Sequence, residues 1–221
     1  IIYALQKHSF SVQPFKVGPD YIDPGYLSRI SKNETYNLDA WLMGEKQLLH
    51  SFTSNSKSSI SVIEGVMGYY DGFSGDSNYA STHHVASITK SPVLLVLDAS
   101  KTSRSIAATA LGFIKFHRNS RIVGIILNKI GSKKHELLCR SALEKTKIPI
   151  IGVIPKNLLL TMPSRHLGLI STLENNVLKK QIKKVSKIIS ENIDINQIIK
   201  IAKNSSDLTK KSKPIHKKSK T

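Results

Sequence analysis

A lysine and two carboxylates follow the first strand that the sequence predicts, in a segment rich in glycine and proline. The strand is Ser11–Lys16. Lys16 can bind phosphate as a point charge, and Asp20 on a rigid Gly-Pro turn can hold Mg²⁺ or a polar group of a substrate. A plain turn capped by Asp20 and Asp23 explains the same residues. Asp23 is the better cap because it precedes Pro24, which leaves Asp20 as the functional candidate.

An acidic residue also ends the next predicted buried strand, Ile60–Glu64. A carboxylate in that position is costly unless it is paired or ligates a metal, and Gly65 lets the backbone approach a ligand closely. A structural ion pair between Glu64 and Lys16 is the alternative. Asp71 follows in a glycine-rich loop, which either orders over a substrate or lies on the surface with Asp71 in water.

The predicted strands Val93–Asp98 and Ile122–Asn128 also end in polar residues. Asp98 is either a partner of metal ligands or a cap of the helix predicted after it. Asn128 is followed by Lys129, and an asparagine in this position can hydrogen-bond the edge of an adenine. Ligands of parallel sheets bind at the carboxyl ends of the strands, so these segments are where the sequence predicts a site.

Composition and spacing exclude several other kinds of site. The single cysteine, Cys139, rules out an intramolecular disulfide and a cysteine-based zinc or iron–sulfur centre. No G-x-S-x-G motif marks a serine nucleophile. The adjacent His83 and His84 point about 100° apart on a helix, so they cannot form an i, i+4 metal pair. No apolar run reaches the ~20 residues that span a bilayer and no secretory leader is present. We therefore expect a cytoplasmic protein without a membrane partner.

The formal net charge of +18 is concentrated near the end of the chain. Residues 177–221 carry 13 Lys and Arg against 3 Asp and Glu, whereas residues 1–176 carry 20 against 12. Lysine supplies 27 of the 33 basic residues, and nucleic-acid readers rely mainly on the bidentate contacts of arginine. We therefore expect a solvated basic tail and no specific nucleic-acid partner.

Short strands that are apolar on both faces alternate with amphipathic helices. This pattern is typical of an α/β domain with a doubly wound, mostly parallel sheet. Besides the strands above, the sequence predicts a last strand at Ile150–Ile154. The helices predicted within this alternation are Ile1–His8, Asp23–Ile30, Leu38–Phe52, Tyr79–Thr89, Ser105–Phe116 and Lys133–Lys145.

Two further helices, Val177–Asn192 and Ile195–Lys203, are predicted after the sheet. We therefore expect one domain over residues 1–203, and a lysine-rich linker or disordered tail over residues 204–221. The phosphate-loop pattern G-x-x-x-x-G-K-[ST] does not occur in the sequence, which begins inside a predicted helix. A chain that had lost its first strand and phosphate loop would begin in this way, and we expect it to bind ATP poorly by itself.

Ordered blocks along residues 1–203 resemble the cobyrinic acid a,c-diamide synthase family. The blocks are FKVGPDYIDP at residues 15–24, NLD at 37–39, EGVMG at 64–68, YDG at 70–72, PVLLVLD at 92–98, SRS at 103–105, GIILN at 124–128, GVIP at 152–155 and RHLGL at 165–169. The resemblance implies a P-loop NTPase fold like that of dethiobiotin synthetase. It also implies ATP-dependent amidation of the a and c carboxylates of a corrin precursor of cobalamin, through acyl phosphates, with nitrogen from glutamine or ammonia.

The resemblance also implies roles for individual residues. Asp20 and Glu64 would bind Mg²⁺ with the phosphates of ATP, and Lys16 would contact the transferred phosphate. Asp71 and Tyr21 would face the corrin substrate. Asn128 would hold the adenine, with Pro155 near the base.

No glutaminase domain follows in this sequence, so a glutaminase domain or subunit is an expected partner, and a homodimer is compatible with the sequence. Three other activities of related proteins remain open alternatives: amidation of a nickel tetrapyrrole, a partitioning-type ATPase, and dethiobiotin synthetase. A remnant without activity is a further alternative.

Overall fold

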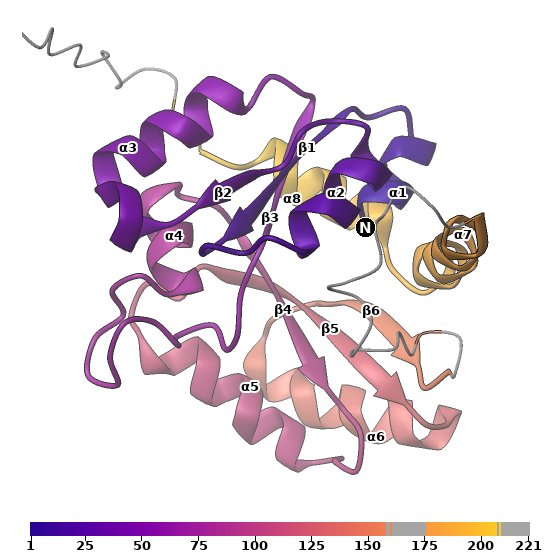
Figure 1. Cartoon of the computed structure of the whole chain (residues 1–221). Helices are drawn as coiled ribbons and strands as arrows, with labels where there is room; N and C mark the ends of the chain where they lie inside the picture. Colours follow the sequence, from indigo (N-terminus) through magenta and orange to yellow (C-terminus); the bar gives the residue numbers. More distant parts are fainter. Residues whose placement is uncertain (158–159, 161–175, 207, 209–221) are drawn as a thin grey trace, which may run out of the picture.

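Two three-stranded parallel sheets organise the part of the chain that the computed structural model describes, residues 1–157, 160, 176–206 and 208 (Figure 1). The first sheet has the order β2-β1-β3 and the second the order β4-β5-β6. The strands are β1 (Val12–Val17), β2 (Tyr36–Leu38), β3 (Ile60–Glu64), β4 (Val93–Asp98), β5 (Ile122–Ile130) and β6 (Ile150–Pro155). Every strand pair is parallel, which confirms the predicted α/β class.

The sheet is divided, which the sequence did not predict. β3 pairs with β1 and β4 pairs with β5, but no ladder joins β3 to β4 in the described residues. Side chains hold the two sheets together instead. Ile60 of β3 and Ile151 of β6 belong to one hydrophobic cluster, and Val62 and Leu94 pack against it.

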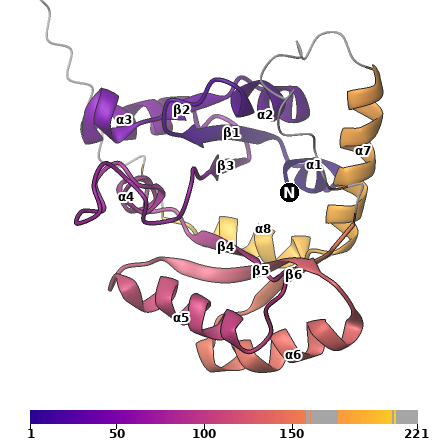
Figure 2. The same cartoon turned by 60° about the horizontal axis from the view of Figure 1, so that its bottom comes forward.

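Helices cover the sheets and fill the space between them. Figure 2 shows α5 and α6 on one face of the β4-β5-β6 sheet and α8 on the other. The helices are α1 (Ile2–Lys7), α2 (Asp23–Ser31), α3 (Ala40–Asn55), α4 (Thr82–Ile88), α5 (Ser105–Phe116), α6 (Lys133–Leu143), α7 (Asn176–Glu191) and α8 (Ile195–Lys203), with a 3₁₀ turn at Glu144–Thr146. Ile195 and Ile198 of α8 join the cluster between the sheets, so this helix packs against both halves of the molecule.

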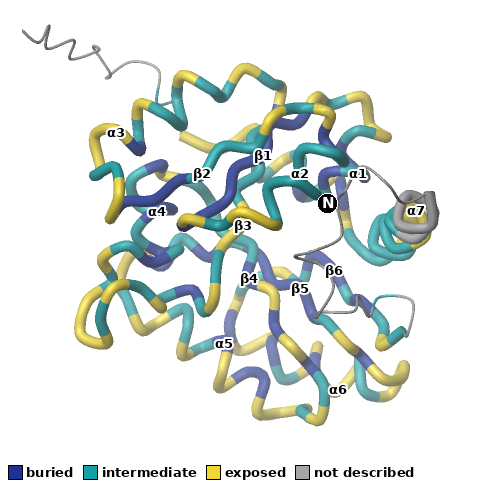
Figure 3. The backbone as a smooth tube through the Cα atoms, in the orientation of Figure 1, coloured by how far each residue is buried: buried dark blue, intermediate teal, exposed yellow. Residues whose placement is uncertain are grey.

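β1 is the most enclosed strand, since all six of its residues are buried (Figure 3). The reason lies in its neighbours: β2 and β3 flank it, and helices α1 and α2 contact it. Phe15 and Val17 pack with Leu38, Leu48 and Val85 in a second cluster. A buried strand carries its last residues, and whatever follows them, on a rigid support.

The predicted elements match the structure except at short or capped segments. β2 was not predicted, because a three-residue strand is too short for an apolar alternation to show. The helix predicted from Leu38 begins at Ala40, where Asp39 caps it by accepting from the backbone N–H of Trp41 and Leu42. The helix predicted from Tyr79 begins at Thr82, because the Ser81 hydroxyl accepts from the backbone N–H of His84.

Most of the predicted tail, residues 204–221, lies outside the described residues, as does the RHLGL block at 165–169. In the described part of the chain, the helices are too short or too polar to cross a membrane.

Replacing Gly124 by Ala should destabilise the fold. A Cβ at Gly124 would meet Cδ1 of Ile151, and it would lie 2.9 Å from Cγ1 of Ile151 and 3.0 Å from Cδ2 of Leu94. Overpacking of this kind costs about 1–3 kcal/mol. Urea unfolding at pH 7 measures the loss.

Gly112→Ala is the matched control. Gly112 lies on α5, and apart from the neighbouring backbone of that helix no atom lies within 4 Å of the added Cβ. The same change there should therefore raise the free energy of unfolding by about 0.5–1 kcal/mol. Equal effects at the two glycines would contradict the packing described for β5.

Candidate functional site

The candidate site lies at the carboxyl ends of β1 and β3. Parallel pairing sets Lys16 of β1 beside Glu64 of β3, and the same lysine pairs in register with Asn37 next to the end of β2. Lys16 and Glu64 are therefore neighbours, as the alternative prediction of an ion pair between them requires. Their proximity depends on a strand register that no local sequence pattern encodes.

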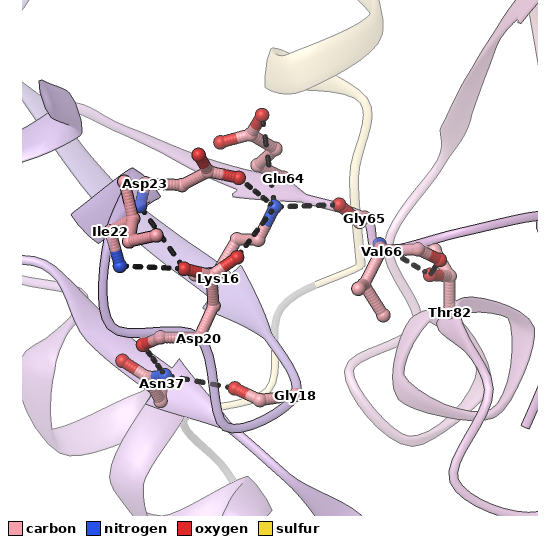
Figure 4. A network of polar contacts seen from close by, with 10 residues as sticks. All are labelled: Lys16, Gly18, Asp20, Ile22, Asp23, Asn37, Glu64, Gly65, Val66 and Thr82. Carbon is pink, nitrogen blue, oxygen red and sulfur yellow. Dashed lines mark hydrogen bonds and ion pairs between the residues drawn. The ribbon is translucent and has the colours of Figure 1, made fainter. Parts of the chain in front are cut away.

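Lys16 is the centre of the site, and its side chain is surrounded by three carboxylates (Figure 4). Its Nζ donates to Oδ2 of Asp23 at 2.7 Å and to the backbone oxygen of Gly65 at 3.1 Å. Oδ2 of Asp20 lies 3.7 Å from the same nitrogen and Oε1 of Glu64 lies 3.8 Å from it. Lys16 is only 3% exposed, so its charge is balanced by these acids rather than by bulk water.

The electrostatics of the cluster follow from burial and mutual charge. Burial disfavours the ammonium of Lys16, but its hydrogen bond to Asp23 and the charges of Glu64, Asp23 and Asp20 outweigh this effect, so the pKa of Lys16 is raised. Burial raises the pKa of Glu64 more than the lysine lowers it. The lysine therefore stays charged, but its charge does not fully offset the cost of burying the Glu64 carboxylate.

Asp20, and not Asp23, accepts the hydrogen bonds of this turn, and it also faces Lys16. Oδ1 of Asp20 accepts from the backbone N–H of Ile22 at 2.8 Å and of Asp23 at 3.1 Å. These bonds overcome the effect of burial and lower the pKa of Asp20. Asp23 is not the cap of α2, because the first position outside the helix is Ile22 and no side chain caps it. The prediction that Asp23 caps the helix was wrong, because the carboxylate of Asp23 binds the ammonium of Lys16 at the end of β1 instead.

The turn that carries Asp20 is fixed by its own backbone and by Asn37. The amide of Asn37 donates to the backbone oxygens of Gly18 at 2.8 Å and of Asp20 at 2.6 Å. Gly18 has φ of +81°, a conformation that glycine adopts without strain. Tyr21, at the tip of this turn, is 92% exposed, so its ring is free to meet a ligand.

Asp20 and Glu64 suit a magnesium ion in their chemistry. Mg²⁺ takes one or two protein carboxylates and completes its shell with water and phosphate oxygens. The oxygens of both residues converge on the volume around the Lys16 ammonium. Among the described residues, no three acid, histidine or cysteine side chains are grouped as a complete metal cage. Two carboxylates leave the remaining positions of such an ion to water and phosphate oxygens.

The loop after β3, which carries Asp71, is anchored by residues that the sequence analysis did not single out. The hydroxyl of Tyr69 donates to the backbone oxygen of Ser120, and that of Tyr70 donates to the backbone oxygen of Phe113 at 2.7 Å. Asp71 follows directly and is exposed, with Oδ2 accepting from the backbone N–H of Gly68 at 2.8 Å. The Tyr-Tyr pair before Asp71 was the available signal for this anchor.

Asn128 and Pro155 lie at the carboxyl edge of the second sheet. Pro155 ends β6 and lines a shallow pocket of about 240 Å³ with residues of β5 and α6. Asn128 lies on β5 outside that lining, and its Oδ1 accepts from the backbone N–H of Lys129. The two residues thus share an edge of the sheet, but the structure does not bring them to one pocket.

Asp98 caps no helix. Its Oδ2 accepts from Nζ of Lys129 at 2.6 Å, and its Oδ1 accepts from the backbone N–H of Ser100 at 2.8 Å. The hydrogen bond from Lys129 and those from Ser100 lower the pKa of Asp98 to about 2. The first position outside α5 is Arg104 instead, so the prediction of a helix cap at Asp98 was wrong.

The family model described as "CobQ/CobB/MinD/ParA nucleotide binding domain", named CbiA, matches residues 1–170. This chain belongs to the CbiA family. The match extends over both sheets and includes every candidate residue named above.

CbiA-family relatives with established names are about two-fifths identical to this chain. A cobyrinate a,c-diamide synthase of Listeria innocua is 41% identical over 212 residues, which are 95% of this chain and 47% of that protein. One of Picrophilus torridus is 44% identical over 209 residues, with coverages of 94% and 47%. The chain therefore spans about half the length of the curated relatives that it matches.

A solved structure confirms the fold of the CbiA-family domain. The MinD cell division protein of Aquifex aeolicus superposes with a TM-score of 0.54 at 15% identity, over 90% of this chain and 88% of that one. At this identity the likeness concerns the fold alone, a P-loop NTPase architecture with parallel strands.

Lys16→Met should destabilise the chain most strongly near neutral pH. The change leaves three carboxylates without their shared cation, and because these acids are partly exposed we expect a loss of about 1–3 kcal/mol. The pKa of Asp20 is lower in the folded protein than in the unfolded chain. Its contribution to stability is therefore fully present at pH values above the pKa of the unfolded chain, and it is lost as the pH falls through the pKa of the folded protein. Urea unfolding of wild type and variant at pH 7 and pH 4 measures the difference.

Lys57→Met, at an exposed lysine in the same half of the molecule, controls for the loss of one positive charge. A loss of stability for Lys16→Met that is the same at both pH values would contradict the ion cluster.

Proposed function

We propose that this chain is the ATP-dependent synthetase domain of a cobyrinic acid a,c-diamide synthase. The observation that carries the proposal is the buried Lys16 with Asp20 and Glu64 at the strand ends of a CbiA-family domain. Relatives named for this activity are about 40% identical over almost the whole chain, which supports the corrin as substrate. The synthetase domain would comprise residues 1–203, and residues 204–221 would link or follow it.

The reaction joins two anions, which is why a cluster of cations and metal ligands is required. A carboxylate oxygen of the corrin attacks the γ-phosphorus of ATP, the bond between that phosphorus and the ADP oxygen breaks, and an acyl phosphate forms. Ammonia then attacks the acyl carbon, phosphate leaves with the bonding electrons, and the nitrogen loses a proton to give the amide. Positioning and neutralisation of the phosphate charge are the main demands on the protein.

The residues of the first sheet would meet these demands. Asp20 and Glu64 would hold Mg²⁺, which when bound neutralises the phosphate oxygens and orients them. Lys16 would contact the transferred phosphate, and its hydrogen bond to Asp23 keeps its ammonium in place until then. Tyr21 and Asp71 would contact the corrin from the two exposed segments that border this cluster.

The second sheet would hold the base of ATP. Asn128 would hydrogen-bond the adenine, and Pro155, on the neighbouring strand β6, would pack beside the ring at this edge of the sheet. Nitrogen would come as ammonia from a glutaminase domain or subunit, since the relatives are about twice as long as this chain. A homodimer is compatible with this arrangement.

The proposal is tested by assaying ATP-dependent amidation of cobyrinic acid, with ammonium as the nitrogen source. The assay uses the 221-residue chain and the longest in-frame coding sequence that contains it. Chromatography separates the acid, the monoamide and the a,c-diamide, and ADP is measured in parallel. From the longer protein we expect one ADP for each amide formed, which is two ADP for each molecule of a,c-diamide. ATP hydrolysis without amidation by the longer protein would refute the proposal.

Glu64→Gln and Asp20→Asn should each reduce kcat for amidation about 10²–10³-fold, because each removes a charge that holds the metal. Raising the Mg²⁺ concentration should recover part of the loss. Glu144→Gln, at an exposed glutamate on the 3₁₀ turn, is the control. Full activity in either site variant would exclude these residues as metal ligands.

Asp71→Ala should raise KM for the corrin about 10–100-fold and leave the Kd for Mg-ATP within twofold, because Asp71 would hydrogen-bond only the corrin. Steady-state kinetics and calorimetry measure the two quantities. The control is Asp76→Ala, an exposed aspartate of the same loop. Equal losses in both quantities would contradict a role in substrate binding.

A further inference from the structure

Exposed apolar side chains gather at the same edge of the molecule as the Lys16 cluster. Seven of the eleven large hydrophobic residues that are exposed in the described chain lie in the segments that follow β1, β2 and β3. Trp41 is 58% exposed and Phe73 is 68% exposed. Leu42 follows Trp41 in the segment after β2, and Tyr79 lies with Phe73 in the segment after β3. A concentration of this kind marks a binding surface rather than the scattered apolar residues of an ordinary protein surface.

The two largest rings form a stacked pair. The centroids of Trp41 and Phe73 are 6.3 Å apart and their planes differ by 22°. Tyr79 meets Phe73 edge to face at 6.5 Å. We call Trp41 and Phe73 the aromatic platform. It joins the start of α3 to the loop after β3, two segments more than thirty residues apart in the chain.

The backbone beneath the aromatic platform is held rigidly. Phe73 donates its backbone N–H to the oxygen of Tyr79 at 2.9 Å, and the hydroxyl of Tyr79 donates to the backbone oxygen of Ala40 at 3.2 Å. A Cβ at Gly72 would meet the backbone oxygen of Tyr79, so the two sides of this loop lie as close together as a glycine allows. Asp39 fixes the other side by capping α3 at the N–H of Trp41. The rings are therefore preorganised, which favours binding.

We propose that the aromatic platform carries the ring of the corrin substrate, while the peripheral carboxylates of that ring reach the Lys16 cluster. This inference rests on the proposed function. The faces of a corrin are apolar, and its cobalt exceeds the single negative charge of the ring, so the core is cationic. Aromatic faces attract cations as well as apolar surface.

The charges around the aromatic platform agree with such a ligand. Asp71 lies two residues from Phe73, and Glu45, four residues after Trp41, is paired with His84 at 3.0 Å. Acidic neighbours suit a cationic core and disfavour a nucleic acid. The loop that carries Phe73 starts at Gly65, whose oxygen accepts from Lys16, so one segment connects the Phe73 side of the aromatic platform to the reactive centre.

Trp41 is the only tryptophan of the chain, so its emission reports on the aromatic platform directly. The full chain is titrated with cobyrinic acid, and equilibrium dialysis measures the Kd in parallel. N-acetyltryptophanamide corrects for light absorbed by the corrin. We expect saturable quenching with the Kd that dialysis gives. Cobinamide, a corrin whose side chains are amides, should also quench, at higher concentration.

Phe73→Ala should weaken binding of cobyrinic acid at least fivefold. Leu137→Ala is the control, since Leu137 is 59% exposed on α6, in the other half of the molecule. Circular dichroism confirms that both variants fold. Trp41→Phe should retain affinity and Trp41→Ala should lose it, because the inference requires an aromatic face and not the indole nitrogen.

Three results would overturn the inference. Dialysis that finds no binding of cobyrinic acid to the wild type would refute the corrin and with it the proposed function. Binding with unchanged Trp41 emission, or with equal affinity in Phe73→Ala, would refute the aromatic platform alone and leave the proposed function standing. Sedimentation that shows a dimer lost in Phe73→Ala would assign the surface to a second copy of this chain.

Discussion

A buried ammonium balanced by three carboxylates is the interaction on which the candidate site depends. Lys16 sits at the end of the most enclosed strand, where water cannot stabilise its charge. Asp23, Asp20 and Glu64 must therefore remain close to it, and each comes from a different backbone setting: a helix, a turn and a strand. Neutralising the lysine thus also assembles the oxygen atoms that a divalent cation requires.

The same residues connect the site to the rest of the molecule. Gly65 accepts from Lys16 and opens the long loop that Tyr69 and Tyr70 anchor to the second half of the chain. Between the two sheets, packing is provided by side chains of β3, β6 and α8 rather than by a strand ladder. The phosphate-binding and base-binding edges predicted for this family therefore belong to separate sheets, joined by apolar contact and by this loop.

The geometry of the Lys16 cluster is consistent with the sequence similarity to cobyrinate a,c-diamide synthases. Identity of about 40% spans both sheets, while the chain matches about half the length of those proteins. The pairing of hard oxygen ligands with a lysine suits transfer of a phosphoryl group to a carboxylate. The exposed aromatic residues along the same edge are what the proposed corrin, a large and flat acceptor, would require.

The sequence by itself determined the α/β class, most element bounds and the position of Lys16, Asp20 and Glu64 at or just after strand ends, because apolar periodicity is a local property. Only the tertiary structure decided the register that sets Lys16 beside Glu64, the pairing of Asp23 with Lys16, the division of the sheet, and the stacking of Trp41 on Phe73. Each of these depends on a contact between segments that meet only when the chain is folded, and a carboxylate's partner is set by which cation lies nearest in space.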